Sequence, residues 1–242
     1  MSVLILFLIG LSMSTISLVV GSMTPIYLGL MQVFFPALTL GNIMGADKVS
    51  GISRNLGAIP SFWSHIDWKF IAQNIPAFLI GSAIGASFIS EISSDWILPL
   101  LIFAFFIAEF APSLSRFFKG KAFLLFEGLL GVYAGVIVAS IKPILLAVFR
   151  LRISDDNKIM FLKIQIQTIM FFVSVGAAVA HYFHGTLILW VIIPLAIGNI
   201  LGGFLGGTIL KKTGKMSGRI QKNVMRASFC IGILTSAWVV FR

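Results

Sequence analysis

The sequence has 242 residues, of which 58% are hydrophobic and only 11% are charged, and its mean hydropathy is +1.03. A soluble domain carries about 25% charged residues, so this composition excludes a soluble enzyme and a disordered chain. A single cysteine, Cys230, excludes a disulfide-stapled secreted domain. The remaining class is a helical membrane protein that crosses the bilayer several times. The net charge of +10 is then first a topology signal, not a nucleic-acid surface.

Apolar stretches that approach the roughly 20 residues of a membrane span recur along the whole chain. The first has neither a basic leader nor a clear cleavage site, so we expect a retained helix rather than a signal peptide. It ends at a break of small residues and proline, and a second such break follows later. In chain order the predicted segments are 3–20, 26–40, 46–63, 70–89, 96–111, 124–138, 144–149, 159–180, 187–210 and 224–241.

The two breaks reveal an internal repeat. The first, at 21–25, reads Gly-Ser-Met-Thr-Pro, and the second, at 139–143, reads Ala-Ser-Ile-Lys-Pro, 118 residues later. Prolines, glycines and serines recur in register at this offset, which predicts two homologous halves, 1–112 and 122–242, joined by a basic connector, 113–121. The identical pairs are Ser22/Ser140, Pro25/Pro143, Ile26/Ile144, Leu28/Leu146, Gly10/Gly128, Pro76/Pro194 and Gly85/Gly203.

The distribution of lysine and arginine predicts the topology, because basic loops stay in the cytoplasm. The connector 113–121, the segment 150–158 and the loop 211–222 are basic, whereas the loops 90–95 and 181–186 contain no lysine or arginine. This pattern is consistent only if each half crosses the membrane an odd number of times, with both termini outside. We therefore predict an all-α membrane protein of two inverted repeats, each a proline-broken first hairpin plus three transmembrane helices, with about 8–10 membrane segments. Such repeats are typical of secondary transporters, whose site lies between them.

The two breaks are the first candidate substrate site. Proline interrupts a helix, and a helix that restarts in a wet cavity directs its N-terminal N–H groups at an anion. Hydroxyl groups and one lysine accompany these helix starts, and no carboxylate is close by in the sequence. The alternative is a pair of proline kinks whose hydroxyls bond their own helices. The candidate residues are Ser22, Thr24, Pro25, Ser140, Lys142 and Pro143.

Arg54 and Asn55 lie in the middle of the apolar stretch 46–63 and are the second candidate. A charge at the centre of a bilayer costs about 2.5–3.5 kcal/mol on insertion scales, so Arg54 is expected to face the protein interior. Its planar guanidinium suits bidentate contact with an oxyanion. The alternatives are a structural ion pair with Glu109 or Asp47, capping of buried carbonyls, or solvation on an interfacial helix.

Polar residues of the matching stretch in the second half are the third candidate. Lys163 and Gln167 are four residues apart, so they share a helix face and could line the pathway. The alternative for Lys163 is extension to the cytoplasmic interface. Glu109 and Glu127 could relay protons, although pairing with the basic connector is the favoured interpretation.

Metal and catalytic sites are not expected. His181 and His184 form only a weak pair in a predicted outer loop, and zinc prefers three or four ligands. The sequence contains no nucleophile elbow, HExxH motif or Walker A loop. We therefore predict no enzymatic activity, no cofactor and no metal.

The spaced glycines indicate close helix packing, at the pairs 81/85, 198/202 and 202/206.

These features together resemble the TauE/SafE family of sulfite and organosulfonate exporters. The resemblance rests on two repeats of about 100 residues, the small-residue break and proline in each, the polar third segment, and a fourth helix that opens near Asp67-Trp68 and ends on spaced glycines. The second half repeats the spaced glycines of this fourth helix, with Pro194, Gly198, Gly202 and Gly206. The resemblance implies a permease of the bacterial inner membrane for small anions, without enzymatic activity.

The sequence thus predicts a secondary transporter that exports a small oxyanion, such as sulfite or an organosulfonate, by alternating access. An anion channel or uptake permease of the same fold, and a non-transporting scaffold subunit, are the alternatives. The predicted partners are a small anion (sulfite, an organosulfonate or a carboxylate) and membrane lipid, with a homodimer considered and no nucleic acid.

Overall fold

The computed structural model describes residues 2–20, 23–89, 96–114, 122–136, 141–150, 159–213 and 218–240. Within these ranges the chain is helical and contains no strand, which confirms the all-α fold. The helices are α1 (Ser2–Val20), α2 (Thr24–Phe34), α3 (Leu40–Phe62), α4 (Trp68–Ile89), α5 (Ile97–Leu114), α6 (Ala122–Val136), α7 (Ile141–Arg150), α8 (Ile159–Phe183), α9 (Leu189–Thr213) and α10 (Gly218–Val240), with a short 3-10 turn, η1 (Trp63–His65), between α3 and α4.

Four of these helices are long and apolar enough to cross a membrane: α1, α4, α8 and α9. Their burial differs, because 72% of the apolar window of α8 is buried inside the protein, against 33% for α1. α8 is therefore an interior helix, whereas α1 presents large exposed side chains such as Val3, Leu4 and Leu8 on its outer side. This arrangement of apolar helices is that of an integral membrane protein.

The prediction of one segment over 26–40 is wrong, because the chain leaves α2 after Phe34 and restarts at Leu40. Pro36 explains the stop, since proline lacks an N–H and disfavours the helical conformation of the residue before it. Thr39 explains the restart: its hydroxyl accepts a hydrogen bond from the Asn42 amide at 3.2 Å, and the Asn42 side chain accepts one from the Thr39 amide at 3.2 Å. This reciprocal cap starts α3 six residues earlier than position 46.

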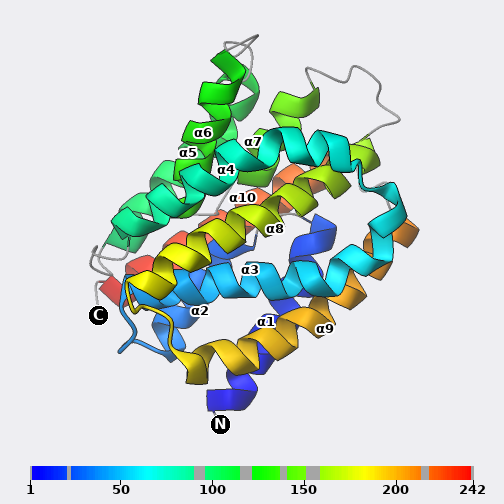
Figure 1. Cartoon of the computed structure of the whole chain (residues 1–242). Helices are drawn as coiled ribbons and strands as arrows, with labels where there is room; N and C mark the ends of the chain where they lie inside the picture. The colour runs from blue at the N-terminus through cyan, green and yellow to red at the C-terminus, as the bar shows by residue number, and fades with distance from the viewer. Residues whose placement is uncertain are drawn as a thin grey trace.

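The helices pack in a continuous series through the molecule. α1 packs on α9, α9 on α3, α3 on α8, α8 on α4 and α4 on α6. Figure 1 shows α3 and α8 crossing the middle of the molecule, with α1 and α9 below them and α4 and α6 above. The shorter helices complete the bundle, because α2 packs on α10 and α7 packs on both α5 and α8.

Glycines allow the closest of these approaches, as the small-residue spacing predicted. A Cβ atom at Gly198 or Gly202 of α9 would overlap the carbonyl oxygen of Phe7 or Leu11 in α1. At Gly85 of α4 it would overlap the carbonyl oxygen of Val132 in α6. The prediction of close helix contact at these spaced glycines is therefore confirmed.

α3 is apolar at both ends and polar in its middle. Its first turns, from Leu40 to Ala46, belong to one cluster of buried hydrophobic side chains, and Ala58 and Phe62 belong to a second. The turns between carry buried or half-buried polar side chains, including Asp47 and Arg54. The fold thus holds a polar stretch of α3 between two apolar clusters.

Candidate functional site

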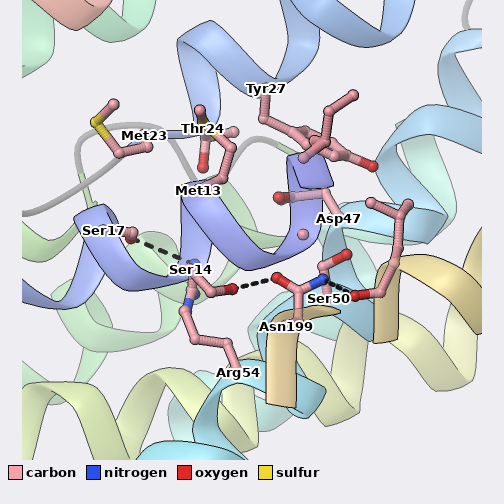
Figure 2. Close-up of a pocket in the computed structure, with 13 residues that line it drawn as sticks. Met13, Ser14, Ser17, Met23, Thr24, Tyr27, Asp47, Ser50, Arg54 and Asn199 are labelled. Carbon is pink, nitrogen blue, oxygen red and sulfur yellow. Dashed lines mark hydrogen bonds between the residues drawn. The ribbon is translucent and has the colours of Figure 1, made fainter. Parts of the chain in front are cut away.

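One face of α3 lines a small, partly enclosed cavity. Asp47, Ser50 and Arg54 are spaced three and four residues apart, so they project from the same side of the helix. The cavity has a volume of about 20 Å³, enough for a water-sized molecule. Figure 2 shows these side chains with Ser14 and Ser17 of α1 and Asn199 of α9. The cavity is therefore built where α1, α3 and α9 meet.

The start of α2 closes another side of the cavity. Met23 precedes the helix, Thr24 is its first residue, and both line the cavity together with Tyr27. Pro25 stands in the first turn, where the missing N–H of proline is tolerated because that group has no intrahelical acceptor. The first break thus places the positive end of a helix dipole beside the polar face of α3.

Two cationic side chains meet on one hydroxyl group beside this cavity. Arg54 Nη1 donates a hydrogen bond to Ser17 Oγ at 3.3 Å, and Lys142 Nζ, from the first turn of α7, donates to the same oxygen at 3.4 Å. Both distances are long for bonds from charged donors. Because Ser17 accepts both bonds, its own proton remains available to a further acceptor.

The cationic groups are not neutralised by a carboxylate at contact distance. Within the described part of the chain, neither Arg54 nor Lys142 has an acidic oxygen within 4.0 Å. Arg54 Nε and Ser50 Oγ are buried and have no hydrogen-bond partner among the described residues. A buried polar group without a partner carries a desolvation penalty of about 1–3 kcal/mol, which a bound acceptor would relieve.

Ser14 and Asn199 form the wall opposite α3. The Ser14 hydroxyl donates to Asn199 Oδ1, and Asn199 Nδ2 donates to the Leu195 carbonyl oxygen at 2.6 Å. The first of these bonds joins α1 to α9 at the level of the cavity, and the second lies within α9. Both residues are buried, so their polar groups are oriented by the helices rather than by solvent.

Comparison with known protein families adds the deciding observation. The family described as sulfite exporter TauE/SafE matches residues 3–237, nearly the whole chain. The chain belongs to this family. TauE/SafE proteins are membrane transporters rather than enzymes, and the resemblance seen in the sequence is confirmed. No curated protein and no solved structure matches the chain significantly.

The structure brings some of the predicted site residues of this TauE/SafE chain together. Thr24 and Arg54 line the cavity, and Lys142 reaches its wall at Ser17. Pro25 and Pro143 lie in the first turns of α2 and α7, directly after the breaks. Two further candidates, Ser22 and Ser140, lie outside the described residues.

Three other predicted residues lie away from the cavity lining. The Gln167 amide donates to Asn55 Oδ1, and Asn55 Nδ2 donates to the Gly51 carbonyl oxygen at 2.8 Å. Both side chains are buried, so this pair joins α8 to α3. Lys163 lies four residues earlier on α8, is half-buried, and is not among the residues that line the cavity.

Sequence reasoning missed the residues that complete the cavity: Ser14, Ser17, Ser50 and Asn199. A signal existed, because Ser14 and Ser17 are three residues apart and Ser50 is four residues before Arg54. It also missed Lys48, whose fully buried ammonium donates to the Ala134 carbonyl oxygen of α6 at 2.8 Å. Single serines in an apolar helix are common, so spacing alone could not select the three serines of the cavity.

The placement of His181 in an outer loop is wrong. It belongs to the last turn of α8, is fully buried, and its Nδ1 lies 2.8 Å from the Thr186 hydroxyl. Gly185, with φ of 66°, makes the turn that brings Thr186 back to the helix end. Among the described residues, no group of three or more His, Cys, Asp or Glu side chains could hold a metal ion.

Proposed function

We propose that this TauE/SafE protein is a secondary transporter that exports a small oxyanion, such as sulfite or an organosulfonate, across the bacterial inner membrane. The observation that carries the proposal is the convergence of Arg54 and Lys142 on the Ser17 hydroxyl beside the cavity, with no carboxylate of the described residues within 4.0 Å of either cation. Family membership supports a transported sulfur oxyanion.

Electrostatics favours an anion between the two cations. Because Arg54 Nη1 and Lys142 Nζ both lie within 3.4 Å of Ser17 Oγ, the two like charges repel by about 2 kcal/mol or more at an effective dielectric of about 20, and a bound anion converts this repulsion into attraction. Arg54 offers a planar pair of donors that fits two oxygens of a sulfite or sulfonate group. The Ser50 hydroxyl and the start of α2 at Thr24 add donors from other sides.

The packing of the helices supports two inverted repeats that rock against each other. Five helices, α1 to α5, are followed by five of corresponding order, α6 to α10. The first helix of each proposed half packs on the fourth helix of the other, as α1 on α9 and α6 on α4, and the third does the same, as α3 on α9 and α8 on α4. Such exchanged packing suits alternating access around a site at the repeat interface.

The membrane potential suffices to drive export of a single negative charge. Moving one charge through 100 mV is worth about 2.3 kcal/mol, which corresponds to about a fiftyfold concentration ratio. A cavity of only about 20 Å³ favours a carrier over an open channel, because a conducting pore needs a continuous path.

The test is sulfite efflux from proteoliposomes under an imposed potential. Arg54→Gln and Lys142→Met should each reduce the initial rate about 100-fold, because each removes a charge-assisted contact to the substrate. Lys69→Met is the matched control, since Lys69 is an exposed cation of α4 and should leave efflux within about twofold of wild type. Normal efflux in folded Arg54→Gln and Lys142→Met proteins would refute the site.

Two further measurements separate the alternatives. Currents in a planar bilayer far above carrier turnover would establish a channel. A purified, folded chain that is not stabilised by any small oxyanion would favour the scaffold subunit, because ligand binding to the folded state raises its apparent stability.

A further inference from the structure

Asp47 is an acidic residue in the wall of a cavity that is otherwise suited to anions. It lies on the same face of α3 as Arg54, seven residues earlier, and both line the cavity. Within the described residues, its carboxylate has no cationic nitrogen within 4.0 Å. We propose that Asp47 restricts the site to singly charged oxyanions; the inference rests on the proposed function of the cavity as the substrate site.

Among the described residues, one charge of each sign lines the cavity, Arg54 and Asp47, and a second positive charge, Lys142, lies behind Ser17. Arg54 and Lys142 approach it through Ser17, and Asp47 faces it from α3. The third buried cation, Lys48, does not line the cavity, because its ammonium donates to the carbonyl oxygen of Ala134. That carbonyl belongs to the last turn of α6, where the helix dipole is negative and offsets part of the charge of the lysine.

A site with a net charge of about +1 discriminates strongly between ligand charges. The cost of removing an ion from water rises with the square of its charge, so a dianion pays about four times the penalty of a monoanion of similar size. The attraction to the site rises only in proportion to the charge. A monoanion neutralises the cavity, whereas a dianion leaves an uncompensated negative charge beside Asp47.

The ligand class follows from this balance. Alkanesulfonates and hydrogen sulfite carry one negative charge at neutral pH and offer three oxygens to the donors of Arg54, Ser17 and Ser50. Sulfate has similar oxygens but carries two charges. Asp47 is therefore the residue that distinguishes sulfonate-like monoanions from sulfate, although both carry oxygens of the kind that these donors bind.

The experiment compares methanesulfonate with sulfate, each titrated against the full chain in detergent, with affinity measured by calorimetry and thermal shift. Wild-type protein should bind methanesulfonate about tenfold or more tighter than sulfate. Asp47→Asn should tighten sulfate binding about tenfold or more and abolish or invert the preference. Asp47→Glu, which keeps the charge, should keep the wild-type preference.

Asp67→Asn is the matched control. Asp67 lies outside the cavity, and its carboxylate caps α4 by accepting a hydrogen bond from the Phe70 amide at 3.0 Å, a role that asparagine also fills. The Asp67→Asn substitution removes the same charge as Asp47→Asn but outside the cavity, so the ratio of methanesulfonate to sulfate affinity should remain that of the wild type. If Asp47→Asn does not fold, Asp47→Ser removes the charge with a smaller side chain.

The outcomes separate the inference from the proposed function. Binding of both anions to the wild type, with a ratio that does not change in a folded Asp47→Asn or Asp47→Ser protein, would overturn the role of Asp47 and leave the anion site intact. Binding of neither anion to the wild type would overturn the site itself, and the role of Asp47 with it.

Discussion

α3 and α8 are the third helices of the two proposed repeats, and their polar side chains differ in chemistry. On α3, Asp47, Ser50 and Arg54 line the cavity, and two of their buried atoms, Ser50 Oγ and Arg54 Nε, have no partner. The residues 118 positions later on α8 are Gln165, Thr168 and Phe172. The charged side chains of α3 thus have neutral counterparts on α8.

The two polar side chains at these positions of α8 have hydrogen-bond partners in the protein. Gln165 Oε1 accepts from the Asp67 amide at 3.0 Å, while its Nε2 donates to the His65 carbonyl oxygen at 2.9 Å. Thr168 donates to the Ile164 carbonyl oxygen of its own helix at 3.0 Å. The difference teaches that two helices at matching positions of the proposed repeat need not share their chemistry. At these positions the polar groups of α8 bond the protein, whereas those of α3 include buried donors without a partner among the described residues.

The largest expected effect concerns the crossing of α3 and α9, which holds the cavity face in place. A Cβ atom at Gly57 would overlap the carbonyl oxygen of Ile200, and its next neighbours are also backbone atoms, at 2.9 and 3.0 Å. Gly57→Ala should therefore lower the free energy of unfolding by about 2–4 kcal/mol, because two helices must move apart. Thermal unfolding in detergent measures this loss.

The control for that substitution is Gly128→Ala on α6. A Cβ atom there meets no atom within 4 Å, and alanine is the better helix former, so the protein should become up to about 1 kcal/mol more stable. Equal stability of the Gly57 and Gly128 variants would show that the α3–α9 contact is looser than described.

The next largest effect is expected from breaking the hydrogen bond between Gln167 of α8 and Asn55 of α3. Gln167→Leu leaves Asn55 Oδ1 buried without its donor, which should lower the free energy of unfolding by about 1–3 kcal/mol. The affinity for methanesulfonate should stay within about twofold of wild type, because the pair does not line the cavity. Denaturation and anion titration on the same preparation distinguish the two quantities.

The double variant Asn55→Leu/Gln167→Leu supplies the control, since removing both partners should recover part of the stability lost in the single variant. A Gln167→Leu protein with wild-type stability and weakened anion binding would reverse the assignment and return Gln167 to the substrate pathway.

The sequence predicted the helices well because composition decides membrane class and prolines mark the breaks. It misplaced the start of α3, since a capping pair such as Thr39 and Asn42 is not distinguishable from ordinary polar residues until the turn is seen. It also grouped Asn55 with Arg54 as ligand contacts, whereas adjacent helix residues point about 100° apart and these two face different neighbours.

The candidate site was only partly predictable for a related reason. A buried charge such as Arg54 is conspicuous in an apolar helix, because its insertion is costly. The meeting of Arg54 with Lys142 on Ser17 depends on how α1, α3 and α7 pack, and residues 17, 54 and 142 have no relation in sequence that would reveal it. Tertiary packing, rather than pattern, selects which serines of the chain become part of the cavity.

The smallest expected effect comes from removing one hydroxyl group, either from α3 at Ser50 or from α8 at Thr168. Ser50→Ala removes a buried donor that the protein leaves without a partner, so the folded state should keep its stability or gain slightly, while the KM for sulfite efflux rises about three- to tenfold. Thr168→Val at the corresponding place on α8 removes a hydroxyl that bonds its own helix, so efflux should remain within about twofold of wild type. Because both changes delete one oxygen from a buried helix, the contrast isolates the ligand-facing role of Ser50. An unchanged KM in Ser50→Ala would mean that its hydroxyl serves the protein alone, and that the α3 face binds the anion through Arg54 without it.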